Sequence, residues 1–467
     1  MIDTLKPYRE YKKSELPWLD GLAPGWRILR GKGVFSAVDV RSGTGDEELL
    51  TVSASDGVVP RRLKTVTMFM AKSYVGHKLC WPGDVVVNSL WAWMQGLGVA
   101  QHHGLISSAY SVYRPRPEFT GYARFFHYLL RSSAYKWELQ TRSKGVWLSR
   151  LQLSDGAFMD MPIVLPPPDE QVAIARFLDH ANGQMDRFIR AKKKVIALLN
   201  KQKQAIIRRA VTRGLDPSVP LKRSDIPWLG DIPMHWEVRR GKFLFDRIDV
   251  RSRTGDEELL TVSSSDGIVP RSTKTVMMFK AASYVGHKLC WPQDLVINSL
   301  WAWARGFGFS KYHGIVSTAY GVYRLHHEYR LRWTYFNELL RSPSYDWEFH
   351  ARSRGIWKSR LQLTDASFLD MRIVIPPEPE ALEIVRYIDE STAGYSSAIQ
   401  RTEQEIALIR EYRARLIADV VTGKLDVREA ARDIPLAKPE ETESPAEEAD
   451  LVEEEVEEAL SAETTHE

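Results

Sequence analysis

The stretch Gly45–Arg61, GDEELLTVSASDGVVPR, returns almost unchanged as GDEELLTVSSSDGIVPR at Gly255–Arg271. A second stretch, SYVGHKLCWPGDVVVNSLWAW at Ser73–Trp93, returns as SYVGHKLCWPQDLVINSLWAW at Ser283–Trp303. Both returns have an offset of 210 residues, far above the roughly 20 to 50 residues of solenoid repeats. The chain is therefore predicted to contain two copies of one domain, each followed by a connector.

Length and composition limit the class of protein. A chain of 467 residues is too long for one ordinary domain. It contains no run of about 20 apolar residues and no apolar N-terminal core of signal-peptide length, so we exclude a membrane protein and expect a cytoplasmic one. The two cysteines, Cys80 and Cys290, exclude a secreted disulfide framework.

Charge is distributed unevenly along the chain. Residues 438–467 carry one Lys against 13 Asp plus Glu, a net charge of −12, whereas the whole chain carries +4. The remainder therefore carries +16, an excess that suits a polyanion such as nucleic acid. The acidic tail has too few large apolar groups to offset its ordering entropy, and we expect it to be disordered.

Each copy changes character at a proline cluster, Pro166–Pro168 in the first and Pro376–Pro379 in the second. Before the first cluster, the runs Asp84–Trp93 and Ile106–Tyr113 are rich in β-branched and aromatic residues, which predicts strands. The segment Phe125–Ser132 has apolar residues at helical spacing and predicts a helix. Each copy is therefore expected to be an α+β domain.

After the prolines, apolar residues recur at coiled-coil spacing. In the first copy they are Met185, Phe188, Val195, Leu199 and Ile206, and in the second Tyr395, Ile399, Ile406, Ile409, Leu416 and Val420. One long helix cannot bury its own stripe, so the two are predicted to pair. An antiparallel pair would relate the copies by an approximate two-fold axis, which suits two half-sites on DNA.

The predicted fold is α+β: a tandem duplication of a mixed α/β domain, each copy followed by a long helix, with the helices pairing as an antiparallel coiled coil. The expected boundaries are 1–165 for the first domain, 166–215 for its helix, 216–375 for the second domain, 376–432 for its helix, and 433–467 for the acidic tail.

Residues suited to DNA contact fall on predicted loops, where Arg, Lys, Asn and Gln can reach phosphates and base edges. The candidates of the first copy are Arg61, Arg62, Lys64, Asn88, Gln95, His102, Arg142, Lys144 and Arg150. Those of the second copy are Arg271, Lys274, Asn298, Arg305, Lys311, Arg352, Arg354 and Arg360. The alternative for all of them is ordinary solvated surface. Trp91 and Trp93 are expected to pack in the core.

Catalytic motifs are absent from the sequence. There is no Asn or Asp before Pro-Pro as in adenine methyltransferases, no phosphate-binding P-loop, and no dinucleotide fingerprint around Gly96 and Gly98. His77-x-x-Cys80 and its repeat at His287 and Cys290 could begin a zinc site. A buried core cysteine is the favoured interpretation, because no second cysteine pair exists.

Three motifs together resemble the specificity subunit of type I restriction-modification enzymes. They are LPPPDEQVAIARFLD at Leu165–Asp179, RRAVTRGLDP at Arg208–Pro217 and WLGDIPMHWEV at Trp228–Val238. The resemblance covers residues 12 to about 430. It implies two target-recognition domains, each binding one half of a split DNA site, held by paired helices that also dock methyltransferase subunits.

We therefore expect a non-catalytic DNA-binding subunit that brings two methyltransferase subunits, with restriction and translocase subunits, to double-stranded DNA. Because the copies share most of their loops, the site is expected to be nearly palindromic. No cofactor is expected in this chain; S-adenosylmethionine, ATP and Mg are expected on the partner subunits. The alternatives are a free-standing nucleic-acid-modifying enzyme with an unrecognised site, and an orphan DNA-binding regulator.

Overall fold

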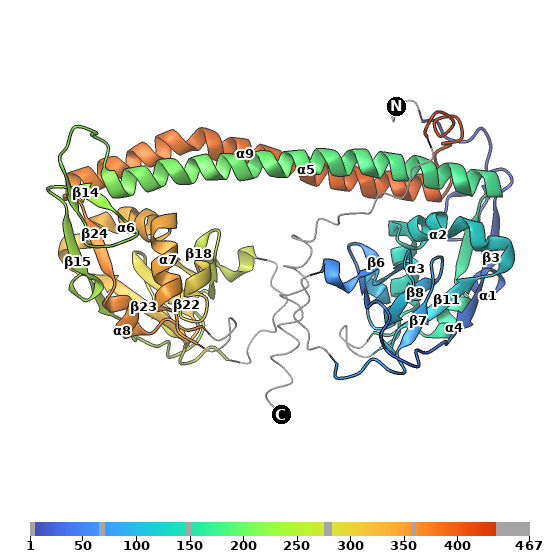
Figure 1. The fold of residues 1–467 in the computed structure, drawn as a ribbon, viewed down its shortest axis with the longest axis horizontal. Helices are drawn as coiled ribbons and strands as arrows, with labels where there is room; N and C mark the ends of the chain where they lie inside the picture. The colour runs from blue at the N-terminus through green and yellow to red at the C-terminus, as the bar shows by residue number, and fades with distance from the viewer. Residues whose placement is uncertain (1–4, 65–70, 146–150, 275–282, 356–360, 436–467) are drawn as a thin grey trace. The chain divides into compact units, whose positions relative to one another are not determined.

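The computed structural model describes residues 5–64, 71–145, 151–274, 283–355 and 361–435. The chain divides into two compact units, one of residues 1–191 and 404–467 and one of residues 192–403. Each unit contains one mixed copy and about half of each long helix (Figure 1). No helix in the described ranges has the length and apolarity that a membrane crossing requires.

The first unit is built around a four-stranded antiparallel sheet with the strand order β4-β11-β8-β9. These strands are β4 (Phe35–Val38), β11 (Ser111–Pro115), β8 (Val85–Val87) and β9 (Leu97–Val99). Four antiparallel pairs surround it: β1 (Lys12–Lys13) with β2 (Gly21–Leu22), β3 (Arg27–Arg30) with β12 (Pro162–Leu165), β5 (Leu50–Ser53) with β6 (Gly57–Pro60), and β7 (Lys78–Cys80) with β10 (Gly104–Ile106). Its short helices are α1 (Gly31–Val34), α2 (Ala123–Leu130), α3 (Ser133–Arg142) and α4 (Asp155–Met159).

The second unit repeats this plan. Its four-stranded sheet has the order β16-β23-β20-β21, with β16 (Phe245–Arg247), β23 (Tyr320–Leu325), β20 (Asp294–Asn298) and β21 (Phe307–Phe309). The surrounding pairs are β13 (Leu221–Arg223) with β14 (Asp231–Pro233), β15 (Glu237–Arg240) with β24 (Arg372–Ile375), β17 (Leu260–Ser263) with β18 (Gly267–Pro270), and β19 (Lys288–Cys290) with β22 (Gly314–Val316). Its short helices are α6 (Trp333–Leu340), α7 (Pro343–Arg352) and α8 (Asp365–Leu369).

The predicted strands are shorter in the structure than in the sequence pattern. The run Asp84–Trp93 is a strand only over β8, because Asn88 begins a turn in which Trp91 N–H donates to Asn88 O at 3.0 Å. The run Ile106–Tyr113 is split between β10 and β11 by a turn in which Tyr110 N–H donates to Ser107 O at 3.1 Å. Turns that begin at Asn88 and Ser107 therefore interrupt both predicted strands. Asn and Ser are residues that favour turns.

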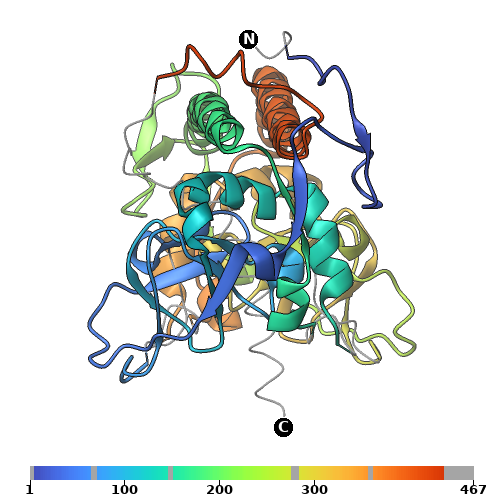
Figure 2. The same ribbon diagram turned by 90° about the vertical axis from the view of Figure 1, so that its right-hand side faces the viewer.

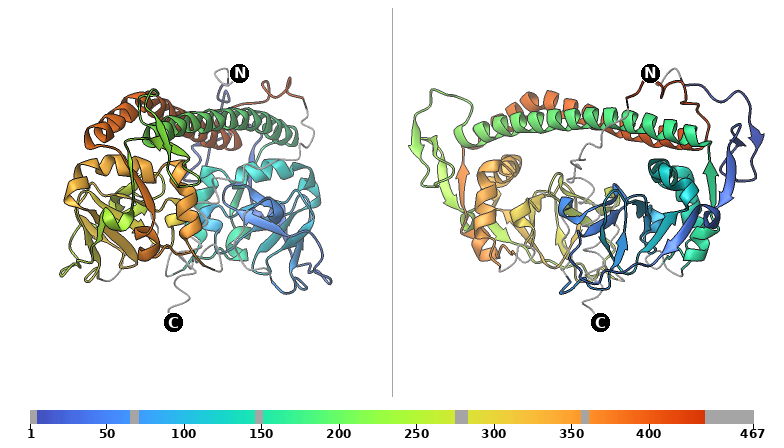
Figure 3. Two further views of the ribbon diagram at one scale, coloured as in Figure 1. Left: turned by 60° about the vertical axis from the view of Figure 1, so that its left-hand side comes forward. Right: turned by 45° about the vertical axis from the view of Figure 1, so that its right-hand side comes forward.

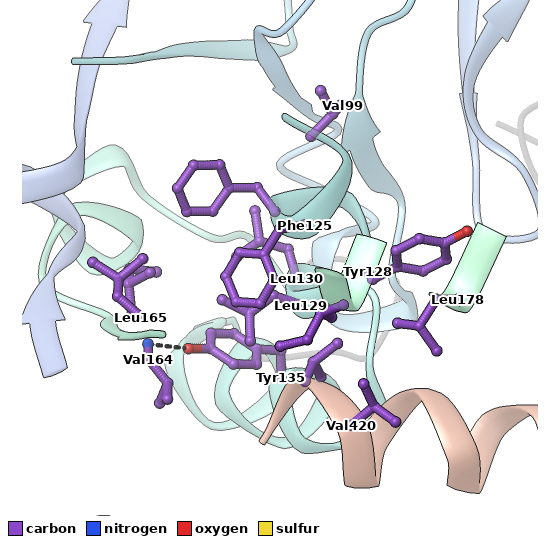
Figure 4. Close-up of a cluster of buried hydrophobic side chains, with 14 of the residues drawn as sticks. Val99, Phe125, Tyr128, Leu129, Leu130, Tyr135, Val164, Leu165, Leu178 and Val420 are labelled. Atoms are coloured by element: carbon purple, nitrogen blue, oxygen red, sulfur yellow. Dashed lines mark hydrogen bonds between the residues drawn. The ribbon is translucent and has the colours of Figure 1, made fainter. Parts of the chain in front are cut away.

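The core of the first unit lies where α2, α3 and β12 meet the long helices (Figure 4). Leu129 and Leu130 are buried there, and Leu178 and Val420 from the long helices join the same cluster. Burying each leucine contributes about 1.5–3 kcal/mol. The buried Tyr135 hydroxyl donates to Pro162 O at 2.9 Å and accepts from Val164 N–H at 3.0 Å, which ties α3 to β12.

The long helices are α5 (Pro168–Arg213) and α9 (Glu378–Val421). Proline at the first turn suits a helix start, because the N–H that it lacks would be unpaired there. Gly214 and Gly423 follow the two helices with φ of 71° and 75°, the left-handed conformation that ends many helices. The predicted boundary at residues 165 and 166 falls between β12 and α5, whereas α9 ends eleven residues before the predicted position 432.

The two long helices pack against each other in the antiparallel sense, as predicted (Figure 3). In the first unit, Arg413 of α9 pairs with Asp186 of α5. In the second unit, Lys203 Nζ donates to Ser396 Oγ at 2.9 Å. The contact position therefore advances along α5 as it retreats along α9, which defines antiparallel pairing.

The buried stripe of α5 differs in detail from the predicted seam. Met185 is buried, but Phe188 and Val195 are 61% and 47% exposed, and Ile189 is buried instead. Leu178 and Ile189 are thus eleven residues apart on the buried face, the spacing of a straighter helix that has drifted from a strict heptad. In α9 the predicted Ile406, Leu416 and Val420 are buried as expected.

Residues after α9 complete the first unit, in which the two helices lie side by side above the mixed domain (Figure 2). Val427 is fully buried in the first core. Lys6 and Asp426 form an antiparallel bridge, and Tyr11 Oη donates to Lys424 O at 3.0 Å. The two ends of the described chain therefore contact each other, beside the start of α5. The predicted acidic tail lies outside the described residues from position 436 onward.

Glu170, in the first turn of α5, is buried at this closure. Its Oε1 accepts hydrogen bonds from the Tyr8 hydroxyl and from Trp26 Nε1, the latter at 3.1 Å. Burial raises the pKa of Glu170 to about 7; Arg428 opposes this effect and Asp426 reinforces it. The native fold therefore favours the protonated carboxyl.

We predict that Glu170→Gln makes stability less dependent on pH. A raised native pKa gives stability that is fully present below the ordinary value of 4.5 and is lost as the pH rises through about 7. The free energy of unfolding of the wild type should fall by about 2 kcal/mol from pH 5 to 8 through this group. Urea unfolding at four pH values checks this, and an equal fall in the variant contradicts it.

Glu380 at the equivalent position gives a matched control. Its Oε2 lies 2.7 Å from His235 Nε2, and its side chain is 25% exposed. Glu380→Gln makes the same substitution where the carboxylate is partly exposed, so it should change the pH dependence of unfolding less than Glu170→Gln does.

Candidate nucleic-acid interface

The turn that follows β8 and β20 brings together two of the predicted contact groups. In the second unit, Asn298 Nδ2 donates to Tyr320 Oη at 3.4 Å, and Asn298 Oδ1 accepts from Leu300 N–H at 3.2 Å. Burial raises the pKa of the Tyr320 phenol, and the nearby Arg271 guanidinium acts to lower it. Arg271 and Asn298 therefore lie close to the same tyrosine.

Backbone hydrogen bonds hold the two ends of the loop after α3 together and join it to the turn after β8. Lys144 and Gln152 exchange both backbone hydrogen bonds at 3.0 Å, and Leu153 N–H donates to Ser89 O at 2.9 Å. The second copy repeats these contacts at Arg354, Gln362, Leu363 and Ser299. Lys144 and Arg354 are exposed. The predicted contacts Arg150 and Arg360 lie outside the described residues.

In the second unit these contacts place Arg271, Asn298 and Arg354 on neighbouring loops, and the first unit has Arg61, Asn88 and Lys144 at the equivalent positions. We define these two sets of three residues as the donor face of each unit. Arg61 and Arg271 follow β6 and β18, Asn88 follows β8 and Asn298 ends β20, and Lys144 and Arg354 follow α3 and α7. Guanidinium, ammonium and amide groups on adjacent loops can bind phosphate oxygens and base edges.

Other predicted contacts hold the domain itself together. Lys64 is 4% exposed and its Nζ lies 2.6 Å from Asp56 Oδ2, and Lys274 pairs with Asp266. Burial acts to raise the pKa of Asp56, but hydrogen bonds from Lys64 and Ser55 lower it overall. Lys64 therefore anchors the β5–β6 hairpin. Arg62 remains 69% exposed, although its Nε lies 2.8 Å from Glu48.

Arg142 and Arg352 also have partners inside their own domains. Arg142 Nε donates to Glu138 Oε2 at 2.6 Å, and the Glu138 side chain is only 4% exposed. Trp18 Nε1 donates to the other oxygen of this carboxylate at 2.7 Å. Arg352 pairs with the equivalent Glu348. Arg142 and Arg352 therefore neutralise buried carboxylates of their own domains.

Gln95 and Arg305 have hydrogen-bond partners inside their own domains. Both have positive φ, 63° and 61°, at the ends of short turns. Gln95 Nε2 donates to Arg131 O at 2.6 Å, and Arg305 Nε donates to Asp346 Oδ1 at 2.7 Å. By contrast, the predicted His102 and Lys311 are exposed in the turns after β9 and β21.

Sequence reasoning based on charge missed an exposed apolar element beside the donors. Leu90 and Leu300 are 45% and 42% exposed at the tip of the turn after Asn88 and Asn298. Trp301 is 46% exposed, and its counterpart Trp91, which was expected in the core, is half-buried. Apolar side chains of this kind insert between base steps in some DNA complexes. The Asn-Ser pair that precedes both leucines was the available signal, because Asn and Ser favour turns.

The His-x-x-Cys segment contributes to the core. Cys80 is fully buried, and His103 Nδ1 lies 3.1 Å from Cys80 O. Burial raises the pKa of the Cys80 thiol to about 12, and that of Cys290 likewise. The described residues contain no cluster of three or more His, Cys, Asp or Glu side chains placed to hold a metal ion.

Comparison with known proteins gives one sequence relative. No protein-family model matches the chain. The type I restriction enzyme MjaVIII specificity subunit of Methanocaldococcus jannaschii is 32% identical over 108 residues. This match spans 23% of the present chain and 23% of that relative.

Comparison with solved structures supports the fold. A chain from a study of complex assembly and conformational transition of the type I R-M system has a TM-score of 0.53 at 17% identity, covering 86% of this chain and 99% of that one. The HsdS subunit from Thermoanaerobacter tengcongensis aligns over 87% and 98% of the two chains, with 16% identity and a TM-score of 0.37. The sequence relative confirms the resemblance to a type I restriction enzyme specificity subunit over the matched residues, and the first structure supports the fold.

We predict that Arg142→Ala destabilises the first unit. It leaves the buried Glu138 carboxylate without its cation, which should lower the free energy of unfolding by about 2–4 kcal/mol. Lys144→Ala, two residues away and exposed, should change it by less than about 0.5 kcal/mol. Denaturant unfolding of both variants checks this. Equal stability of the two would show that Arg142 is not needed to neutralise Glu138.

Proposed function

We propose that this chain is the DNA-recognition subunit of a type I restriction-modification complex and binds a bipartite, nearly palindromic site. The observation that carries the proposal is the duplication of one domain, with the same donor face in each copy, on helices that pair antiparallel. Antiparallel pairing favours the presentation of like surfaces to two half-sites in opposite directions. The +16 charge of residues 1–437 supports contact with a polyanion.

The proposed partners are two methyltransferase subunits, together with restriction and translocase subunits. In this proposal they carry S-adenosylmethionine, ATP and Mg, and the present chain has no catalytic role. The relative from Methanocaldococcus jannaschii is a type I restriction enzyme specificity subunit, which supports the assignment. The long helices α5 and α9 offer extended surfaces for docking.

The test is reconstitution. The purified chain alone should bind DNA without methylating or cleaving it, and methyl transfer should begin only when a methyltransferase subunit is added. Methyl transfer or cleavage by the chain alone would favour the free-standing enzyme. Tight binding with no response to any methyltransferase subunit from the same genome would favour the orphan regulator.

We predict that the selected DNA site is close to an inverted repeat. The two donor faces have an asparagine at the equivalent positions 88 and 298 and a basic residue at the equivalent positions 144 and 354. Similar domains should therefore recognise similar half-sites. Differences should be confined to a base or two recognised near His102 and its counterpart Tyr312. Selection of bound duplexes from a random pool measures this. Two unrelated half-sites would show that the shared loops do not contact bases.

We also predict that the helices set the spacing between half-sites. One heptad inserted into each of α5 and α9, at matching levels between the Arg413–Asp186 and Lys203–Ser396 contacts, adds about 10 Å. The unspecified spacer should lengthen by about two to three base pairs while the recognised bases stay the same. The same selection experiment checks this, and an unchanged spacer would rule out the helices as the ruler.

A further inference from the structure

The second unit has a pocket whose lining contains no donor-face residue. Its volume is about 520 Å³, and its lining includes Arg239, Arg240, Arg372 and Phe243. The first two arginines are on β15, and Arg372 begins β24 beside it. Pockets of about 300–1,000 Å³ are the size that holds small molecules.

The duplication provides an internal comparison for this pocket. At the equivalent positions, the first copy has Leu29, Arg30, Pro162 and Gly33. Three of the four positions have therefore changed, two to arginine and one to phenylalanine, in a chain whose copies share long identical stretches. The change gives the second unit an arginine cluster that the first unit lacks.

The arginines are placed against the ordinary preference of a sheet. Arg240 and Arg372 are directly paired across β15 and β24, and like charges in such pairs destabilise a sheet. Arg240 Nη1 lies 3.1 Å from Asp370, and Arg372 Nη1 donates to Asp225 O at 3.0 Å. Asp225, which also lines the pocket, has a φ of 55°, a conformation that costs energy outside glycine.

A guanidinium group has five N–H donors in a fork that matches the oxygens of a phosphate. The contact with Asp370 holds the Arg240 guanidinium in place through one nitrogen. Arg239, the preceding residue of β15, faces the other side of the strand pair, where its Nε lies 2.8 Å from Glu237 Oε2. Phe243, which also lines the pocket, is 53% exposed. The pocket thus combines anion-binding groups with a flat apolar surface on which a base can stack.

We propose that this pocket binds a small nucleoside phosphate, with the phosphate on Arg240 and Arg372, which are paired on one face of β15 and β24, and the base against Phe243. The asymmetry between the copies gives one such site per chain. This inference does not depend on the proposed DNA-recognition function, because its residues are not members of the donor face.

The first experiment titrates the full-length chain with AMP at low salt by calorimetry. We expect one site per chain, competition by inorganic phosphate, and at least ten-fold weaker binding of adenosine. Arg372→Pro should weaken AMP binding at least ten-fold, whereas Arg239→Leu, on the opposite face of β15, should weaken it less than two-fold. Both introduce the residue of the first copy, which the same β-strand pairing accommodates at Leu29 and Pro162.

The variant Phe243→Gly distinguishes the contribution of the base to the affinity from that of the phosphate. It should weaken AMP binding at least five-fold while changing the affinity for inorganic phosphate less than two-fold. Equal loss for both probes would contradict the stacking arrangement. Competition with AMP by duplex DNA at the same phosphate concentration would assign the pocket to the DNA backbone and overturn the proposal.

The reciprocal experiment builds the site in the first unit with Leu29→Arg, Gly33→Phe and Pro162→Arg together. A Cβ at Gly33 would meet only Leu29 Cβ, at 4.0 Å, so the backbone has room for the side chain. The triple variant should bind two AMP molecules per chain. Failure of the wild-type chain to bind AMP at millimolar concentration, with unchanged DNA binding, would refute the pocket and leave the DNA-recognition function intact.

Discussion

Burial of the apolar stripes on α5 and α9 is the constraint on which the rest of the structure depends. Neither helix can cover its stripe from its own residues, and an isolated helix of this composition gains little stability in water. Each stripe is covered partly by the other helix and partly by a mixed domain, as Leu178 and Val420 show in the first core. Helix pairing and domain packing are therefore one cooperative interaction.

Comparison of the two copies distinguishes basic residues that stabilise the domain from basic residues that are exposed on its surface. Where both copies hold a cation against a buried carboxylate, as at Arg142 with Glu138 and Arg352 with Glu348, the residue stabilises the domain. Lys144 and Arg354 keep their charge on the surface. The partner of a basic residue in the structure thus shows whether the residue stabilises the domain or is exposed to a ligand. The position of the residue in the sequence does not distinguish these two roles.

Repetition and periodicity predicted the duplicated α+β domains and the paired helices, because both patterns extend over many residues. Single side-chain directions were not predictable. Gln95 and Arg305 had donors of the right kind, but left-handed backbone turns direct them to Arg131 O and Asp346. The exposure of Phe188 likewise follows from a small drift in helix phase, which no local sequence signal marks.

The closure of the chain ends has a consequence for synthesis on the ribosome. The second unit is one continuous segment, residues 192–403, whereas the first is completed only by residues after 403. Val420 and Val427, which fill the first core, are translated long after the strands they cover. The domain that emerges first must therefore wait with part of its apolar surface in water, and the later one can finish folding before it.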